Sequence, residues 1–333
     1  MKRARGSDDS MPQVDGTMRA VCMDRFGGPE VLSLRTLPTP EVGPGEVLIR
    51  VEAAGVGQWD PFEREGGYAE MLGLAPRFPY VLGSEGAGIV VAVDERVGRF
   101  TVGDRVYALG FLNPKGGFYA QYAAVDAGCV SFIPDGMTVE QAAVMGGVGI
   151  TALRGLDDVL GIKPGESLMV FGASGGIGHM AVQLAKKMGA RVFAAASGDD
   201  GVALVERLGA DAAVNGRTDD VAAAACAFAP EGLDTALFTA GGETAERALA
   251  TVRTGGRVAY PNGVQPGPQP RSDIRLQSYN GEPDAEIIAR LNRLIESGSF
   301  DVHIARTFPL SQAMEAHLAL GSHHLGKLAL RIH

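Results

Sequence analysis

The feature that most constrains this chain is a glycine-rich turn between a short apolar run and an amphipathic helical pattern. The run from Leu168 to Phe171 is bounded by glycines, which is typical of a buried strand. After the turn, apolar side chains recur with the 3.6-residue period of a helix, and Gly189 follows as a stop signal. A strand that leads directly into a helix restricts the chain to few folds, and the following segments decide among them.

The same alternation continues beyond this helix. Residues 191–197 predict a second strand, "DGVALVERLGA" a second helix and "DAAVN" a third strand; residues 233–242 and 255–263 predict a fourth and a fifth. Short connections between alternating strands and helices indicate an α/β fold, the Rossmann type with a doubly wound parallel sheet. Ligands of such sheets bind beyond the carboxyl ends of the strands.

The turn itself has the spacing Ala173-x-Gly175-x-x-Gly178, a variant of the dinucleotide-binding fingerprint. Gly175 would let a pyrophosphate approach the backbone, and Gly178 would let the helix pack closely on the strand. The helix N-terminus would offer free N–H groups and partial positive charge to the phosphates. The alternative is a tight connection that binds no ligand. The residues predicted to bind the cofactor in this turn are Ala173, Ser174, Gly175, Gly176 and Ile177.

The end of the second strand predicts which dinucleotide is bound. Ala196 stands where an NAD site carries an acid for the ribose 2′-OH, and Ser197 follows it. A small, neutral strand end suits NADP(H), and Arg217 is the nearest cation for a 2′-phosphate. Asp199 and Asp200, which lie close by, weaken this interpretation. The other residues predicted to bind the cofactor are Thr151, Ser197, Arg217, Thr239, Ala240, Asn262, Gly263 and Lys327, although Lys327 could equally be an exposed surface lysine.

Composition bounds the remaining possibilities. A chain of 333 residues exceeds one common core, so two domains are expected. The net charge of −9 argues against nucleic acid or an anionic membrane as the main partner, and no apolar run is long enough to span a membrane. Three scattered cysteines fit a reducing, cytoplasmic location. Residues 1–17 are polar and are expected to form a disordered extension.

The chain from residue 18 onwards resembles the medium-chain dehydrogenase/reductase superfamily. The matching segments include "FGGPEVL", "PGEVLIRVEAAGV", "FPYVLGSEGAGIV", "GASGGIGHMAVQLAK" and "GKLALRI", in order along the chain. The likeness is closest to the zinc-independent quinone oxidoreductase (zeta-crystallin-like) branch. It implies a β-rich, chaperonin-10-like catalytic domain of residues 18–134 and 281–333, a dinucleotide-binding Rossmann domain of residues 135–280, a nicotinamide cofactor and a homodimer or tetramer, of which we expect the homodimer.

The metal ligands of the zinc-dependent relatives are missing. The resemblance places Gly57 where they have a cysteine and Ser84 where they have a histidine, and no histidine precedes His179. A catalytic zinc needs three protein ligands, so no metal is expected. Without a metal ion as Lewis acid, nothing stabilises the alkoxide that forms when an alcohol is oxidised. A quinone or enone, in contrast, still accepts hydride at carbon. Glu85 survives beside the lost site, either as an anchor of the turn or as an acid.

The resemblance also points to a substrate-side motif in "GQWDPFEREGGY". Asp60, Arg64 and Tyr68 match the quinone-reductase pattern, whereas Gly57 and Phe62 replace its Asn and first Tyr. The implied catalytic set is Tyr68, Arg64, Asp60 and Gln58. In it Tyr68 and Arg64 line the nicotinamide-side pocket, Asp60 orients them, and Gln58 supplies an amide. The alternative for Asp60 and Arg64 is a structural ion pair at helical i,i+4 spacing.

Four further side chains carry weaker expectations. Trp59 is a core residue or one wall of an apolar cleft. His179 is expected to be solvated on the first turn of its helix, and His323 and His324 to lie at the surface.

Three functions are compatible with these observations. The favoured one is a zinc-independent, NADPH-dependent reductase that transfers hydride to a small-molecule carbonyl or quinone acceptor (a quinone, enone or alkenal). The second is a dinucleotide-binding sensor or scaffold whose hydride site has decayed. The third, an alcohol dehydrogenase, is disfavoured because its metal ligands are missing.

Overall fold

The predicted parallel sheet is present in the computed structural model, which describes residues 14–333. All its strand pairs are parallel, and their order is β11-β10-β9-β12-β13-β14. The strands are β9 (Ser167–Phe171), β10 (Arg191–Ala196), β11 (Ala212–Asn215), β12 (Leu233–Phe238), β13 (Val252–Pro261) and β14 (Arg275–Tyr279). This order reverses between β9 and β12, which creates the crevice where doubly wound sheets bind ligands. The predicted fold class is confirmed.

The edge strand β14 was not predicted from the sequence. Only Tyr279 of its five residues is buried, so the strand lacks the apolar run that marked the other strands. A strand at the edge of a sheet needs fewer apolar side chains, and its segment therefore had the pattern of a loop.

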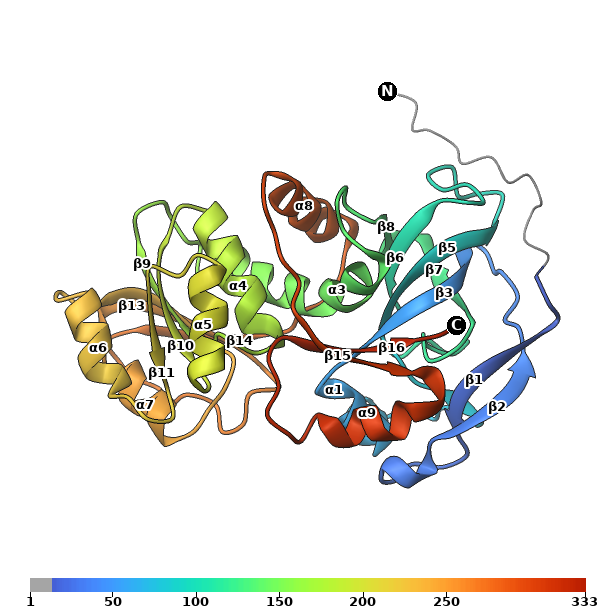
Figure 1. Ribbon diagram of the computed structural model, residues 1–333, viewed down its shortest axis with the longest axis horizontal. Coiled ribbons are helices and arrows are strands. Elements are labelled where there is room, and N and C mark those ends of the chain that lie inside the picture. Colours follow the sequence, from blue (N-terminus) through green and yellow to red (C-terminus); the bar gives the residue numbers. More distant parts are fainter. Residues whose placement is uncertain (1–13) are drawn as a thin grey trace.

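Helices cover both faces of this sheet (Figure 1). The helices that follow its strands are α4 (Gly176–Lys187), α5 (Asp199–Arg207), α6 (Val221–Phe228) and α7 (Glu243–Leu249). Along β9, Leu168 and Val170 pack with the α4 and α5 side, whereas Met169 and Phe171 pack with the α6 and α7 side. This alternation follows from the two-residue period of a strand.

The other lobe is built on a seven-stranded sheet in the order β15-β16-β3-β5-β6-β8, with β7 also paired to β3. Its strands are β3 (Glu46–Val56), β5 (Glu85–Val93), β6 (Arg105–Leu109), β7 (Tyr122–Asp126), β8 (Val130–Phe132), β15 (Ile304–Pro309) and β16 (Lys327–Arg331). A smaller sheet joins β2 (Ser33–Pro38), β1 (Thr17–Met23) and β4 (Tyr80–Val81). Since β16 pairs antiparallel with β3, the end of the chain lies against the N-terminal half.

The remaining helices connect or cover these sheets. They are α1 (Trp59–Arg64), α2 (Gly67–Leu72), α3 (Val139–Leu153), α8 (Ala285–Glu296) and α9 (Ala313–Ala319). Helix α3 begins at a capping box on Thr138 and packs against both lobes, through Ala53 and Ala87 on one side and Met180 on the other. The domain boundaries at residues 134 and 281 stay a prediction. Of the predicted extension, residues 1–13 lie outside the described residues, and β1 begins at Thr17.

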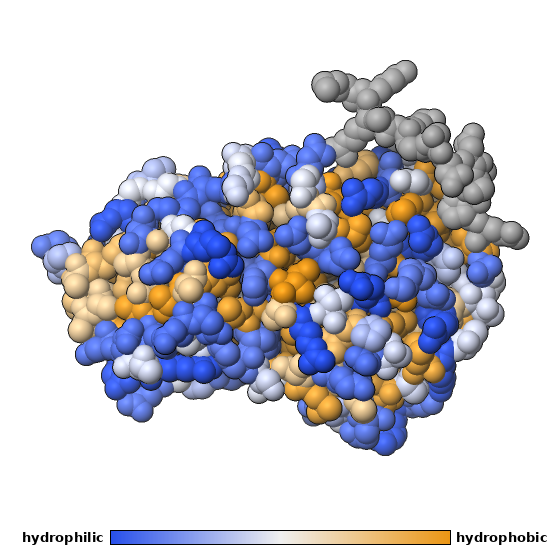
Figure 2. All heavy atoms as spheres, viewed as in Figure 1, coloured by the Kyte–Doolittle hydropathy of each residue, from blue (hydrophilic) through white to orange (hydrophobic). Residues whose placement is uncertain are grey.

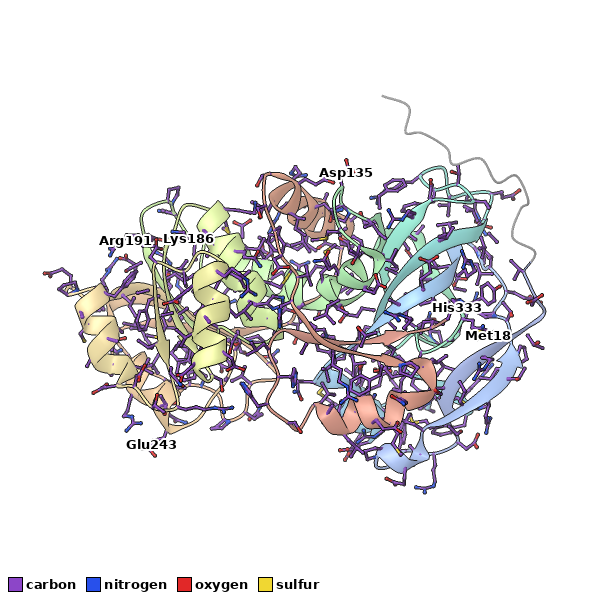
Figure 3. The ribbon with its side chains drawn as sticks, viewed as in Figure 1. Met18, Asp135, Lys186, Arg191, Glu243 and His333 are labelled. Carbon is purple, nitrogen blue, oxygen red and sulfur yellow. The ribbon has the colours of Figure 1, made fainter. Side chains whose placement is uncertain are left out.

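Figure 3 shows how the parallel sheet is oriented. Lys186 and Arg191 lie at its upper edge, where α4 returns to β10, whereas Glu243 lies at the lower edge, beyond the carboxyl end of β12. The carboxyl ends of the strands therefore face downwards in this view. Hydrophilic side chains cover much of the same face of the molecule (Figure 2). Among residues 14–333, no helix is both long enough and apolar enough to cross a membrane.

Candidate functional site

The glycine-rich turn has one position packed against protein and one that faces open space. A Cβ at Gly178 would lie 2.2 Å from the Gly172 carbonyl oxygen and 2.6 Å from Ala173 Cα, so only glycine allows α4 to pack this closely on β9. A Cβ at Gly175 would meet only the Gly172 oxygen, at 3.4 Å. Gly175 therefore leaves space in front of the α4 N-terminus, as a pyrophosphate requires.

Segments from the end of the chain hold this turn in place. Gly326 donates its N–H to the Ser174 carbonyl at 2.8 Å, and Gly175 and Gly326 form an isolated parallel bridge. On the buried side of α4, Gln183 bonds to both the N–H and the carbonyl of Asp301, each at 2.8 Å. The turn is thus fixed by residues more than a hundred positions away along the chain.

His179 contributes to the same arrangement, and the expectation that it is solvated was wrong. Its side chain is fully buried, Nδ1 bonds to the Gly175 carbonyl at 2.9 Å, and the His303 N–H donates to Nε2 at 3.4 Å. Burial lowers its pKa to about 4, so the imidazole is neutral near pH 7. The first turn of α4 faces the returning tail rather than water, which its local helical pattern did not indicate.

The end of β10 forms a neutral recess followed by acidic residues. Ala196 is buried, and the Ser197 N–H donates to Ser174 Oγ at 3.1 Å, which ties the strand end to the glycine-rich turn. Asn215, at the end of β11, accepts the Gly198 N–H at 3.1 Å and donates to Asp199 Oδ1 at 2.8 Å. The Asp199 carboxylate is therefore turned onto Asn215.

Two basic groups meet beside this recess. Arg217 Nη2 lies 3.1 Å from Nδ1 of His323, and His323 Nε2 lies 3.0 Å from Asp200 Oδ2. The pKa of the Asp200 carboxyl is lowered, chiefly by its hydrogen bond with His323. His323 lies between α9 and β16, so only the return of the tail brings it to the strand end. Local sequence carried no signal that places His323 at this strand end.

The other predicted cofactor residues lie on three different elements. Thr239, beyond β12, donates its hydroxyl to the Phe171 carbonyl at 2.9 Å and so lies beside the turn, with the exposed Ala240 next to it. Asn262 and Gly263 are exposed beyond β13, and Asn262 donates to Asn280 Oδ1 at 2.7 Å. Thr151, on α3, donates to the Gly147 carbonyl of its own helix at 2.8 Å. These assignments stay predictions.

In the other lobe, an indole covers Gly57 and Ser84, the positions at which the family resemblance implies lost metal ligands. A Cβ at Gly57 would lie 2.4 Å from the Trp59 ring, so the ring rests directly on Gly57. Trp59 Nε1 donates to Ser84 Oγ at 2.6 Å. The space that a cysteine and a histidine would share is therefore filled by one half-buried aromatic side chain. Among residues 14–333, no three His, Cys, Asp or Glu side chains are grouped so that they could hold a metal ion.

A buried ion pair lies against this indole. Lys327 Nζ is 2.8 Å from Glu85 Oε1 and 4.4 Å from the centroid of the Trp59 ring. Glu85 Oε2 accepts the Gly147 N–H at 2.8 Å. Lys327 is 4% exposed, so the alternative of an exposed surface lysine was wrong. Glu85 joins β5 to α3 through its hydrogen bond with Gly147.

Asp60 and Arg64 do not form the ion pair considered as an alternative; each has other partners. Asp60 Oδ2 accepts the Gly57 N–H at 2.9 Å and the Tyr119 hydroxyl at 2.7 Å. Arg64 donates to Nδ1 of His317 at 2.9 Å, and the other ring nitrogen of His317 lies 3.2 Å from the Tyr119 oxygen. A continuous buried chain of hydrogen bonds therefore joins Arg64 to Asp60. Sequence reasoning missed both Tyr119 and His317 because they come from distant segments.

Burial shifts the titration of this network. Desolvation raises the pKa of Asp60 to about 6, although the Gly57 N–H and Tyr119 partly offset the effect. Desolvation, together with the nearby Arg64 charge, lowers the pKa of His317 to about 3. A neutral His317 that accepts from Arg64 at Nδ1 must carry its proton on Nε2, and so donates to Tyr119. The network is thus ordered from the arginine towards the aspartate.

The other two predicted catalytic residues lie apart from this network. The Tyr68 ring contacts Phe62 and Phe111 edge to face, at centroid distances of 4.7 and 4.9 Å, and burial raises its pKa. This environment suits a wall of an apolar pocket better than a proton donor. Gln58 is exposed and donates to the Leu320 carbonyl at 3.1 Å. Their catalytic roles stay predictions.

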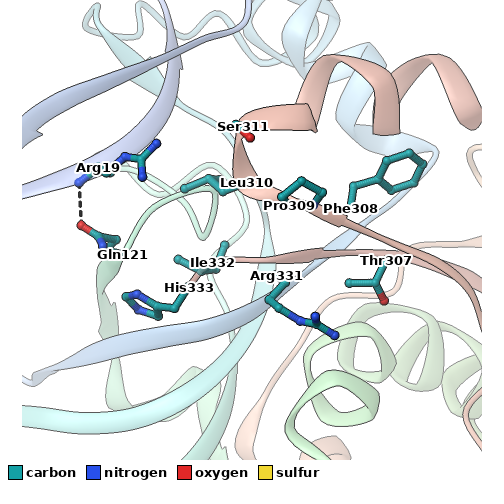
Figure 4. A pocket seen from close by; sticks show the side chains of 10 residues that line it. All are labelled: Arg19, Gln121, Thr307, Phe308, Pro309, Leu310, Ser311, Arg331, Ile332 and His333. Atoms are coloured by element: carbon teal, nitrogen blue, oxygen red, sulfur yellow. Dashed lines mark hydrogen bonds between the residues drawn. The ribbon is translucent and has the colours of Figure 1, made fainter.

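A surface hollow of about 380 Å³ lies elsewhere in the same lobe (Figure 4). Residues of β1, β15 and β16 line it, and the Arg19 N–H donates to Gln121 Oε1 across it at 2.8 Å. None of the predicted site residues lines this hollow.

Comparisons with known proteins agree with this arrangement. Residues 43–135 match the model of the alcohol dehydrogenase GroES-like domain, and residues 176–277 match the model named zinc-binding dehydrogenase. The quinone oxidoreductase of Homo sapiens is 31% identical, over 94% of this chain and 97% of that protein. The chain belongs to the medium-chain dehydrogenase/reductase family, in its quinone oxidoreductase branch.

Solved structures of this family share the whole fold. An NAD-dependent alcohol dehydrogenase superposes with a TM-score of 0.85 at 28% identity, over 95% of this chain and 100% of that one. A mycobacterial protein in complex with NADPH superposes with a TM-score of 0.79 at 29% identity, over 95% and 100% of the two chains. The medium-chain fold therefore serves both NAD- and NADPH-binding relatives, and the cofactor must be argued from this chain's own residues.

Proposed function

We propose that this family member is an NADPH-dependent reductase of quinones, enones or alkenals that works without a metal ion. The observation that carries the proposal is the Trp59 indole, which fills the region between Gly57 and Ser84. A relative that oxidises alcohols through zinc needs that region for the metal and its open coordination position. Here the region offers an aromatic face instead.

The recess at the end of β10 supports NADPH as the cofactor. Ala196 presents no carboxylate to repel a 2′-phosphate, and Arg217 supplies a guanidinium beside it, while His323 links Arg217 to Asp200. Asp199 is exposed, and its carboxylate accepts a hydrogen bond from the Asn215 side chain at 2.8 Å, which occupies one of its oxygens. Charge-assisted hydrogen bonds from an arginine to a phosphate are among the stronger ones in proteins.

When NADPH is bound, its nicotinamide supplies a hydride. The protein's own part is to fix the phosphates at the α4 N-terminus, hold the turn with Gly326 and His179, and present an apolar surface to the acceptor. Trp59 and the three packed rings of Phe62, Tyr68 and Phe111 are the aromatic groups available for that surface. A small-molecule acceptor, a homodimer and a cytoplasmic location are part of the same proposal. Among residues 14–333, β14 pairs only with β13, so its other edge is available for the dimer.

The test is a screen of NADPH and NADH oxidation with 1,4-benzoquinone, 2-cyclohexenone and 2-hexenal, and of NADP⁺ reduction with primary alcohols. We expect turnover with at least one conjugated acceptor and none with alcohols. Tight NADPH binding without oxidation by any acceptor would instead favour a sensor or scaffold. Alcohol turnover that is lost on chelation would reject the proposal.

The cofactor assignment has its own variants. Arg217→Ala and His323→Ala should each raise the KM for NADPH about tenfold and change the KM for NADH less than twofold, because only NADPH carries the 2′-phosphate. Arg207→Ala, which removes an exposed arginine of α5, is the control for net charge. Equal changes for both cofactors would place the 2′-phosphate elsewhere.

A further inference from the structure

We propose that the hollow shown in Figure 4 binds a small organic dicarboxylate, a molecule with a carboxylate at each end of a short hydrocarbon chain. The hollow has a volume of about 380 Å³, which is in the range of small-molecule sites. Residues of β1, β15 and β16 line it, and none of them belongs to the set assigned to the cofactor or the acceptor. The proposal therefore does not depend on the proposed reductase function.

Two arginines without an anionic partner lie at this hollow. Arg19 belongs to β1 and Arg331 to β16, and both residues are exposed. Within residues 14–333, neither guanidinium takes part in an ion pair or a hydrogen bond. None of the side chains that line the hollow is a carboxylate, although the whole chain carries a net charge of −9. A guanidinium offers N–H donors in a planar fork that matches a carboxylate, so the hollow favours an anionic ligand.

The surface between the two arginines is apolar. In Figure 4, the side chains of Leu310 and Ile332 lie between those of Arg19 and Arg331. Leu310 is 5% exposed and Ile332 is 7% exposed, so both are held in the core and form a fixed floor. A hydrocarbon chain on this floor removes apolar surface from water. A phosphate would leave the floor uncovered, and a neutral ligand would leave both guanidiniums without a counter-charge. Two carboxylates joined by a hydrocarbon chain therefore fit the hollow best.

The Arg19 end of the hollow carries a second donor in a fixed position. Gln121 Oε1 accepts the backbone N–H of Arg19 at 2.8 Å, and the backbone N–H of Gln121 donates to the Arg19 carbonyl at 3.0 Å. These two hydrogen bonds hold the Gln121 side chain beside β1 and leave its Nε2 without a partner among the described residues. A carboxylate at this end of the hollow accepts hydrogen bonds from both Arg19 and Gln121.

The expected affinity is modest because both arginines are exposed. Water and salt screen exposed ion pairs, so each pair contributes little by itself. Adipate, a dicarboxylate of about ten non-hydrogen atoms, is expected to bind with a dissociation constant on the order of 1 mM at low ionic strength. The affinity should fall as NaCl is added, since screening acts on both ends of the ligand.

Isothermal titration calorimetry with adipate tests the site. The double variant Arg19→Gln/Arg331→Gln should weaken binding about tenfold, and each single variant about threefold. The control Arg105→Gln/Arg275→Gln removes the same net charge from exposed positions of β6 and β14, and should change the dissociation constant by less than about twofold. All four arginines are exposed, so the variants should fold, and thermal unfolding checks this. Equal adipate binding by the wild-type protein and by the Arg19/Arg331 double variant would overturn the proposal.

A series of ligands tests the chemical class. Succinate and suberate vary the separation of the two carboxylates, whereas hexanoate and 1,6-hexanediol keep the chain length of adipate with one carboxylate and with none. We expect hexanoate to bind about threefold more weakly than adipate, and hexanediol not to bind. Hexanoate bound as tightly as adipate, or no binding of any of the three dicarboxylates, would refute the proposal.

A competition experiment separates this hollow from the proposed cofactor site. Saturating NADPH should leave the affinity for adipate unchanged, because the hollow lies apart from the α4 N-terminus. Loss of adipate binding in the presence of NADPH would place the anion at that N-terminus and would reject the hollow as its site. The titrations with adipate need no turnover, so a failure of the reductase function would leave their outcome unaffected.

Discussion

Substitution of Gly175 by valine should separate cofactor binding from folding. Gly175 has φ −80° and ψ −177°, an extended conformation that valine adopts readily. A Cβ there meets one protein atom, at 3.4 Å, which is an ordinary contact. Replacing glycine also lowers the conformational entropy of the unfolded chain, worth about 0.4–1 kcal/mol in favour of the fold. The free energy of unfolding should therefore stay within about 1 kcal/mol of the wild-type value.

The effect on the cofactor follows from the helix N-terminus. The first bond within α4 runs from the His179 N–H to the Gly175 carbonyl, so the N–H groups before it have no partner within the helix. Hydrogen bonds from such groups to a charged phosphate are worth about 1.5–3 kcal/mol each. Two branched methyl groups at position 175 would occupy the place of that phosphate. Loss of two bonds costs about 3–6 kcal/mol, which corresponds to at least a 100-fold weaker dissociation constant.

Fluorescence titration with NADPH measures the binding, and thermal unfolding measures the fold. Gly178→Ala is the matched control in the same turn, because its Cβ would lie 2.2 Å from a backbone oxygen. That variant should lose about 2–3 kcal/mol of stability from overpacking. Unchanged NADPH affinity in Gly175→Val, or a loss of stability as large as in Gly178→Ala, would refute the placement of the pyrophosphate.

Three further outcomes are expected. Ala196→Asp should raise kcat/KM with NADH relative to NADPH, and an unchanged ratio would mean that the ribose lies elsewhere. Metal analysis should find no stoichiometric zinc, and chelators should leave NADPH oxidation intact, because Gly57 and Ser84 replace two ligands. Glu63 is a buried residue of α1 that accepts the Tyr80 hydroxyl at 2.6 Å. Burial raises the pKa of Glu63 to about 7, so the stability that its protonated form confers is complete below about pH 4.5 and is lost as the pH rises through 7. Glu63→Gln should therefore remove about 3 kcal/mol of pH dependence between pH 5 and 8, measured by denaturant titration; an identical slope in both proteins would contradict the assigned burial.

Much of the fold could be predicted because it depends on short-range patterns. The strands β9 to β12 are short runs with glycines close to both ends, the apolar part of β13 follows Gly256, and α4 and α5 carry the helical period. The parallel sheet could therefore be predicted from residues close together in the sequence. The edge strands β14 and β15 escaped prediction because their side chains are only partly buried.

The candidate site also combines features that the local sequence predicts with features that depend on tertiary packing. The sequence alone predicted the dinucleotide-binding turn, the neutral end of β10 and, through the family resemblance, the replacement of metal ligands at Gly57 and Ser84, since each prediction depends on which residue stands at one position. Only the tertiary structure placed His323 beside Arg217, buried His179 under the turn and set Lys327 against Glu85 and Trp59. These contacts join residues far apart in the chain, and they arise because β16 pairs with β3 and carries the tail past the end of the parallel sheet. The local sequence pattern of β16 does not indicate which strand it pairs with or in which register, because both are decided by the packing of the completed sheet.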